Sequence, residues 1–168
     1  MSLHVIERNQ VILSDIATVF SFFEDPCNLS LITPPWLNFR VRNSSDTRIK
    51  HGTRIEYTIR WYGLPMKWVS LIDRYEPGVC FADRMVQGPY RSWHHIHSLK
   101  PVPRGVEMLD RVEYEMPLAA LGSIAHALLV KRQLQSIFDY RARRVSELFG
   151  QHTPARSVLR PVPHSSGR

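Results

Sequence analysis

Six extended segments in a row, joined by short connections, constrain the fold of this chain more than any other feature. The breaks between them contain turn-forming glycine and proline, as at Pro77-Gly78 and Gly88-Pro89. Parallel strands need a crossover of a dozen or more residues, so connections this short predict antiparallel hairpins. The segments are WLNFRVRN, GTRIEYTIRWYG, PMKWVSLIDRYE, GVCFADRMVQ, RSWHHIHSLK and GVEMLDRVEYEM, between residues 36 and 116.

Hydrophobic and polar residues alternate along several of these segments. In the segment 52–63, Ile55, Tyr57, Ile59 and Trp61 alternate with arginine, glutamate and threonine. Successive side chains of a strand point to opposite faces, so the alternation predicts a sheet with one buried face and one solvated face.

The regions on either side of this meander complete the predicted set of elements. Residues 4–13 are rich in β-branched residues and predict a strand, after which Ser14 is the expected N-cap of a short helix over 15–25. Asp25 before Pro26 predicts a second short helix that ends near Leu31. Residues 118–150 have the periodicity of a long helix. Its predicted apolar stripe consists of Leu121, Ile124, Leu128, Leu134, Ile137, Val145 and Leu148.

This order of elements predicts an α+β fold, with a curved antiparallel sheet of about seven strands wrapped around the C-terminal helix. Two short helices follow the first strand. A space remains between the sheet and the long helix wherever the lining side chains fail to fill it. That space is the candidate functional site.

Length and composition predict a single globular domain. The chain has 168 residues, of which 43% are hydrophobic and 22% charged. No apolar run approaches the roughly 20 residues that cross a bilayer, and the N-terminus lacks the pattern of a signal peptide, so we expect a cytoplasmic protein without stable membrane insertion. We place the domain at residues 1–150 and expect 151–168, which is rich in proline and serine and lacks acids, to be a disordered basic tail.

The net charge of +7 raises the question of a nucleic-acid partner. Three of the positive charges, Arg156, Arg160 and Arg168, lie in the tail. The remaining basic residues are spread over several elements without a nucleic-acid-binding motif, so no nucleic-acid partner is expected. Arg141, Arg143 and Arg144 form a basic patch late in the long helix, which favourable placement near a helix C-terminus explains without a partner.

Five stretches carry a resemblance to a known family: FFEDPCNLSLITPPWLNFRV, GPYRSWHHIHSL, MLDRVEYEMP, LGSIAHAL and IFDYR. With the order of elements, they resemble the START-like (helix-grip, Bet v 1-like) superfamily, and within it the bacterial SRPBCC branch of polyketide cyclase/dehydrase-like proteins. The resemblance covers Leu3 to about Phe149. It implies a deep cavity between the sheet and the long helix that accepts hydrophobic small molecules or lipids, and no cofactor is expected. One departure is Met85, where the branch commonly has glutamine, so no polar role is expected there.

Three histidines lie within four residues of the segment 91–100. On a strand, His95 and His97 share one face with Trp93 and Leu99, which indicates that this face points inward, while His94 lies on the other. Closure of the two adjoining hairpins predicts Asp83 opposite His95 on one side and Asp110 opposite His95 on the other, with Phe81 and Met108 opposite His97. A slip of one residue would dissolve this row.

Three interpretations of the predicted row Asp83–His95–Asp110 remain open. In the first, the carboxylates only satisfy the imidazoles in a cavity wall. In the second, the row is the polar anchor of an otherwise apolar pocket, and His95 acts in an enzyme as general acid or base with Asp110 or Asp83 fixing its tautomer. In the third, His95, His97 and a carboxylate ligate zinc or iron, although His-x-His alone is weak evidence and no metal is predicted.

We therefore predict a protein that binds a hydrophobic small molecule or lipid in its internal cavity. The alternative is a cofactor-independent cyclase or dehydratase that uses His95, Asp110 and Asp83. A third class is an interaction module that contacts a partner through the basic tail. The predicted ligand-binding residues are Tyr57, Ile59, Trp61, Phe81, Met85, Trp93, His97, Met108, Val112 and Tyr114 of the sheet, with Leu121, Ala125 and Leu128 of the helix.

Overall fold

Seven antiparallel strands form one curved sheet in the order β1-β7-β6-β5-β4-β3-β2. The computed structural model describes residues 3–61, 63–116 and 124–150, and of residues 61 and 124–127 only the backbone. The strands are β1 (Leu3–Ile12), β2 (Arg40–Ser44), β3 (Arg54–Trp61), β4 (Leu64–Glu76), β5 (Cys80–Gln87), β6 (Ser92–Val102) and β7 (Gly105–Glu115). The predicted domain boundary at residue 150 and the basic tail lie at and beyond the end of the described residues.

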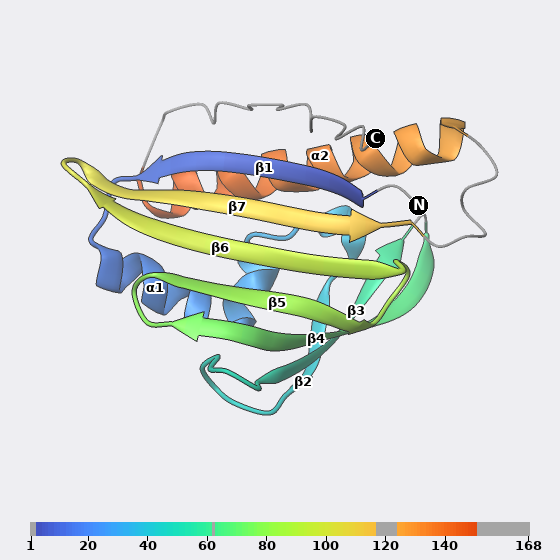
Figure 1. The fold of residues 1–168 in the computed structure, drawn as a ribbon, viewed down its shortest axis with the longest axis horizontal. Coiled ribbons are helices and arrows are strands. Elements are labelled where there is room, and N and C mark those ends of the chain that lie inside the picture. Colours follow the sequence, from blue (N-terminus) through green and yellow to red (C-terminus); the bar gives the residue numbers. More distant parts are fainter. Residues whose placement is uncertain (1–2, 62, 117–123, 151–168) are drawn as a thin grey trace, which may run out of the picture.

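The helices cover one face of this sheet. After β1 the chain forms α1 (Ile16–Glu24) and two 3-10 helices, η1 (Pro26–Leu31) and η2 (Pro35–Leu37), and it ends in the long helix α2 (Ile124–Leu148). Figure 1 shows α2 running behind β1 and β7, and α1 at the left, behind the ends of β5 and β6. This is the predicted α+β helix-grip arrangement, and the predicted fold class is therefore confirmed. Among the described residues, no helix is long and apolar enough to span a membrane.

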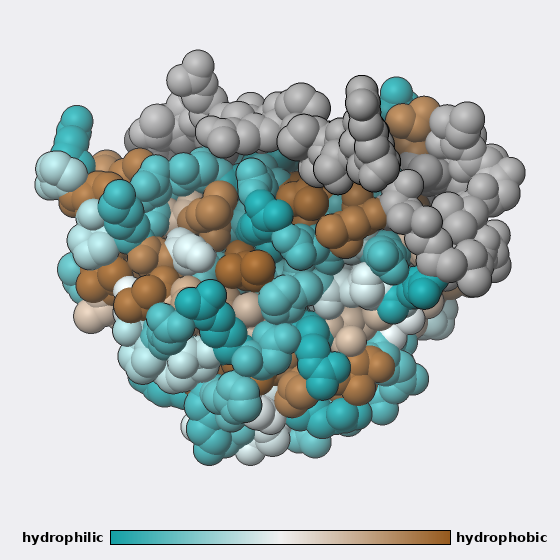
Figure 2. Space-filling model, viewed as in Figure 1, coloured by the Kyte–Doolittle hydropathy of each residue, from teal (hydrophilic) through white to brown (hydrophobic). Residues whose placement is uncertain are grey.

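The face of the sheet away from α2 is turned to the viewer in Figures 1 and 2. Figure 2 shows hydrophilic residues spread across this face, with hydrophobic ones in separate groups between them. The buried residues form two clusters on the other side of the sheet. One is centred on α1 and includes Ile12, Val19, Phe20 and Val106, and the other includes Val112, Val130, Leu134 and Phe138.

Two local predictions in the first third of the chain were wrong. Trp36 and Leu37, predicted to begin a strand, lie in η2 instead, because Pro34 and Pro35 fix the backbone for a turn, and β2 begins only at Arg40. The N-cap of α1 is Asp15, whose carboxylate accepts a hydrogen bond from the Thr18 backbone N–H at 2.8 Å, and not Ser14. The Asp25-Pro26 start of the second short helix is present as predicted, although that helix is a 3-10 helix.

The capping assignment predicts different effects for two neighbouring substitutions. We expect Asp15→Ala to lower the melting temperature by about 2–4 °C, because an unsatisfied first turn destabilises a helix in a domain of this size. Ser14→Ala is the matched control and should change it by less than about 1 °C. Thermal unfolding followed by circular dichroism measures both. An equal loss of melting temperature in the two variants would contradict the assignment of Asp15 as the N-cap.

The β6–β7 register differs from the predicted one by two residues. Val102 pairs with Gly105 across a two-residue turn, so Leu99 lies opposite Met108, and His97 lies opposite Asp110. The sequence prediction treated the whole of 101–105 as loop and paired Leu99 with Val106. A shift of two residues keeps every side chain on its face, so Asp110 still points to the same side as His95 and His97. The β5–β6 register, with Asp83 opposite His95 and Phe81 opposite His97, is as predicted.

The buried face of α2 agrees with the predicted stripe in part. Leu134 and Val145 are buried and Ile137 is partly buried, as predicted, whereas Leu128 and Leu148 are 52% and 42% exposed. Val130, Phe138 and Ala142 complete the buried face in their place. A salt bridge from the buried side chain of Arg8 in β1 to Asp139 of α2, at 2.9 Å, joins the helix to the edge of the sheet.

Candidate functional site

A cavity of about 140 Å³ lies between the inner face of the sheet and α2. Most of its wall is aliphatic or aromatic, and five side chains contribute charged or strongly polar groups: Ser70, Asp83, His95, His97 and Arg141. The wall consists of these five and of Phe23, Pro26, Leu29, Thr33, Leu37, Phe39, Ile49, Ile55, Tyr57, Ile59, Trp68, Ile72, Phe81, Tyr90, Trp93, Leu134, Ile137 and Phe138.

The strand β6 places two of its histidines on the wall and one outside. His95 and His97 are 5% and 3% exposed, whereas His94 lies on the outer face, where its Nε2 is 3.3 Å from Oδ1 of Asp73. The alternation of side chains along β6 separates them in this way. The rings of His95 and His97 are 4.0 Å apart between centroids, and Phe81 stacks on His97 at 4.3 Å.

Asp110 of β7 contacts both inward histidines from behind the wall. Its Oδ1 lies 2.5 Å from Nδ1 of His97 and 3.4 Å from Nε2 of His95. Neither contact has the direction of a hydrogen bond, and all three atoms are buried without another hydrogen-bond partner among the residues that the structure describes. Burial alone would raise the pKa of the Asp110 carboxyl, but the charge of His97 and the close approach of both imidazoles lower that pKa well below its ordinary value. Asp110 is therefore an ionised group that orients both rings.

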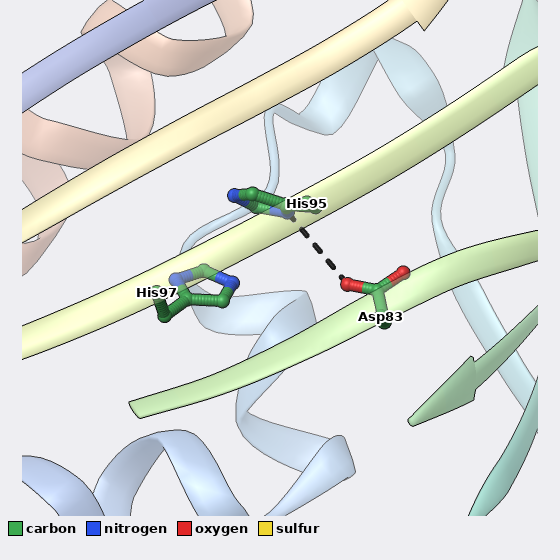
Figure 3. Close-up of side chains that lie close together, drawn as sticks. All are labelled: Asp83, His95 and His97. Atoms are coloured by element: carbon green, nitrogen blue, oxygen red, sulfur yellow. Dashed lines mark ion pairs between the residues drawn. The ribbon is translucent and has the colours of Figure 1, made fainter. Parts of the chain in front are cut away.

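Asp83 of β5 faces the same histidines from the other side. Its Oδ2 accepts a hydrogen bond from Oγ of Ser70 at 2.7 Å, and Ser70 Oγ in turn accepts one from Nε1 of Trp68 at 3.1 Å. Figure 3 shows the Asp83 carboxylate directed toward His95, with 3.8 Å between Oδ1 and Nδ1. Burial raises the pKa of the Asp83 carboxyl, against the hydrogen bond from Ser70 and the charge of His97.

His95 is uncharged at neutral pH. Burial, with the nearby charge of His97, lowers its pKa to about 3, although Asp110 acts in the opposite direction. Phe138 of α2 covers this imidazole edge-on at 5.4 Å between ring centroids. A neutral imidazole with so low a pKa is a weak general base, but it is a good hydrogen-bond partner or metal ligand.

Arg141 is a member of the wall that the sequence analysis missed. It lies on α2, its guanidinium carbon is 5.4 Å from the centroid of the Phe138 ring, and its Nε and Nη1 are buried without a hydrogen-bond partner in the described part of the chain. The helical periodicity contained a signal for this position, because Arg141 follows Leu134 by seven residues and precedes Val145 by four. The sequence analysis grouped Arg141 with Arg143 and Arg144 as a basic patch near the helix C-terminus, and so did not place it in the apolar stripe.

Seven of the residues singled out from the sequence lie together on the wall, and others do not. Those on the wall are Tyr57, Ile59, Phe81, Asp83, Trp93, His95 and His97. The inward residues of β7, Met108, Val112 and Tyr114, are buried in the core instead. Met108 packs in the cluster around α1, and Val112 and Tyr114 pack in the cluster with Val130 of α2, whereas the sheet residues on the cavity wall come from β3 to β6.

The remaining predicted residues fall into two groups. Met85 packs against the second core cluster, and Leu128 is exposed, so neither lines the cavity. Leu121 and the side chains of Trp61 and Ala125 lie outside the described part of the chain. The segment from α1 to η2 also contributes to the wall, through Phe23, Pro26, Leu29, Thr33 and Leu37. The sequence analysis had expected wall residues only from the sheet and the long helix.

Asp83, His95 and His97 have a donor set and a spacing that fit a metal ion. One donor atom from each lies within 4.8 Å of the other two. Two imidazoles and one carboxylate are ligands that zinc and non-haem iron accept. Asp110 contacts a ring nitrogen of each histidine from behind, as a carboxylate that orients metal-ligating histidines does. The metal interpretation from the sequence combined His95 and His97 with a carboxylate, for which Asp110 was the first choice; in the structure Asp83 and not Asp110 completes the set.

Comparison with known proteins gives matches in structure and none in sequence. No family model matches the chain, and no curated protein shows a significant sequence match. The aromatase/cyclase ZhuI from Streptomyces sp. R1128 is similar at a TM-score of 0.70 and 11% identity, covering 89% of this chain and 94% of that one. The di-domain aromatase/cyclase StfQ of the steffimycin biosynthetic pathway is similar at 0.69 and 12%, covering 88% of this chain and 51% of that one. Ara h 8.0201 is similar at 0.60 and 16%, covering 87% and 99%. At these identities the similarity shows a common fold.

Proposed function

Since the chain has the helix-grip fold of the START-like superfamily, we propose that it binds a hydrophobic small molecule in the cavity between the sheet and α2. The observation that carries this proposal is the composition of the wall: aliphatic and aromatic over most of its surface, with Asp83, His95, His97 and Arg141 converging on it. Small-molecule sites commonly combine a mainly apolar surface with a few polar groups that orient the ligand.

The volume of the cavity limits the size of that ligand. An engineered apolar cavity of about 150 Å³ in another protein holds benzene. The present cavity, at about 140 Å³, therefore suits a compact molecule of about one ring. A lipid, the other ligand class expected from the sequence, would need a larger cavity, so the structure favours the small molecule.

Native mass spectrometry tests the proposal most directly. The full chain, purified without detergent or organic solvent from the cells that make it, should carry an organic adduct of defined mass that denaturation releases. Addition of indole to the stripped protein should then shift amide NMR signals of residues around the cavity, among them Trp93 and His95. Indole that shifts no cavity signal would contradict the proposal. A stoichiometric metal mass would instead assign Asp83, His95 and His97 as a metal centre.

Filling the cavity should abolish this binding. We expect Leu134→Trp to weaken indole binding at least tenfold, because Leu134 lies on the wall and an indole side chain occupies the space the ligand needs. Leu129→Trp, the same substitution at an exposed position of the same helix, is the matched control and should bind as the wild type does. Isothermal titration measures both. Equal affinities in the two variants would place indole outside the cavity.

An enzyme of the cyclase or dehydratase type is the second candidate, and the raised pKa of Asp83 favours it. Proton transfer near neutral pH needs a group whose pKa is not far from that pH, and burial moves Asp83 in that direction while it moves His95 away. Asp110 is not on the wall and acts on a ligand only through the histidines. If the protein turns over its ligand, Asp83→Asn should abolish turnover and leave binding intact.

A further inference from the structure

We propose that Arg141 binds the carboxylate of the ligand, which makes the ligand a small aromatic or alicyclic acid. This inference rests on the proposed ligand-binding function and names its substrate class. It starts from the position of Arg141, an arginine in the buried stripe of α2 between Phe138 and Val145, at the edge of the apolar cavity.

The Arg141 guanidinium lacks an anionic partner among the described residues. Its Nε and Nη1 are buried and donate no hydrogen bond to any described residue, and none of the ion pairs found in the described part of the chain includes it. A buried polar group without a partner costs free energy, and a buried charge costs more. Two other arginines on or against α2 have anionic partners: Arg8 pairs with Asp139, and Arg144 with Glu147. An anion in the cavity would supply the partner that Arg141 lacks.

The charges around the cavity suit one anion. Arg141 is the one lysine or arginine among the described lining residues. Asp83 is the one acid among the described lining residues, and its carboxylate already accepts a hydrogen bond from Ser70 and lies 3.8 Å from Nδ1 of His95. Asp110, although ionised, lies behind His95 and His97. One fixed positive charge matches a monoanion, and the planar guanidinium matches a carboxylate through two parallel hydrogen bonds.

The apolar part of the wall selects the body of the acid. Phe81, Trp93 and Phe138 present aromatic rings to the same cavity. With about 140 Å³ available, these surfaces accommodate one ring, which contacts them through its faces and edges. Benzoate, with its carboxylate at Arg141 and its ring among these side chains, is the simplest molecule that meets both requirements.

Binding of benzoate and of its uncharged isostere benzamide to the full chain tests the inference. We expect the wild type to bind benzoate at least tenfold more tightly than benzamide in isothermal titration. Arg141→Met should lose that preference while its benzamide affinity stays within about threefold. Arg143→Met, a neighbouring exposed arginine of the same helix, is the matched control and should keep the preference. Arg141→Met should also melt no lower than the wild type, because it removes a buried unpaired charge.

Each other outcome overturns a defined part of the inference. If wild type binds benzoate and benzamide equally, or if Arg141→Met keeps the preference for benzoate, Arg141 does not bind the carboxylate. The proposed binding of a small molecule in the cavity would still stand. Failure of benzoate, benzamide and indole to bind removes the proposed function itself. Asp83→Asn supplies an independent check: it removes the competing acid, so benzoate should bind several-fold more tightly and benzamide unchanged. Weaker benzoate binding in Asp83→Asn would contradict the proposed distribution of charge.

Discussion

Replacing Asp110 by alanine is expected to lower the free energy of unfolding by about 3 kcal/mol. The carboxylate lies beneath His95 and His97, both almost fully buried, and it is the ionised group toward which both rings are turned. Breaking a buried charge interaction from one side costs roughly 3–5 kcal/mol, because the remaining polar groups stay buried without compensation. Equilibrium urea unfolding, followed by tryptophan fluorescence and circular dichroism together, measures the loss.

A second aspartate–histidine pair across the same sheet provides the control. Asp73 contacts His94 at 3.3 Å on the outer face, where both side chains reach solvent. Exposed ion pairs contribute little to stability, so Asp73→Ala should cost less than a third of the loss caused by Asp110→Ala. Asp110→Asn should lie between the two, because the amide keeps one acceptor oxygen near the rings. Similar losses in the inner and outer alanine variants would show that Asp110 contributes no more than a surface acid.

The strands were predictable from the sequence because their signals are local. The turn residues and the alternation in 52–63 mark the meander within a few positions, and hairpin closure at Gln87–Tyr90 placed Asp83 opposite His95. The prediction for β6–β7 was wrong by two residues, since the turn proved tighter than the Pro-rich stretch suggested. The error of two residues still left Asp110 on the same face as His95 and His97, because side chains along a strand alternate with a period of two.

The shape of the cavity was less predictable because it depends on contacts between distant parts of the chain. Where α2 lies across the sheet decides which inward residues become core and which line a space. Met108 and Val112 obey the strand pattern and still fill the core, Met108 in the cluster around α1 and Val112 in the cluster that includes Val130 of α2. The same dependence determined which positions of α2 are covered: Leu128 is exposed and Arg141 lines the cavity.

The free energy of unfolding is expected to fall as the pH decreases from about 6.5 toward 3, and His95 is expected to cause much of this fall. In the folded chain the pKa of His95 is lowered to about 3, below its ordinary value of 6.5. Between these values the unfolded chain binds a proton at this position and the folded chain does not. Stability therefore rises with pH across this window, by up to about 1.4 kcal/mol per pH unit for one group, and is fully present above it.

A series of urea titrations between pH 6.5 and 4.5 measures this slope in the wild type and two variants. His95→Gln should flatten the slope, because glutamine takes up no proton. His94→Gln, which changes the neighbouring histidine on the outer face, should keep the wild-type slope, since that imidazole stays in contact with water in the folded chain. Asp83 acts with the opposite sign: its raised pKa makes the folded chain bind the extra proton, so its contribution to stability falls as the pH rises. Asp83→Asn should accordingly steepen the slope. If His95→Gln and Asp83→Asn both keep the wild-type slope, burial of the two groups is not the source of their shifted pKa values.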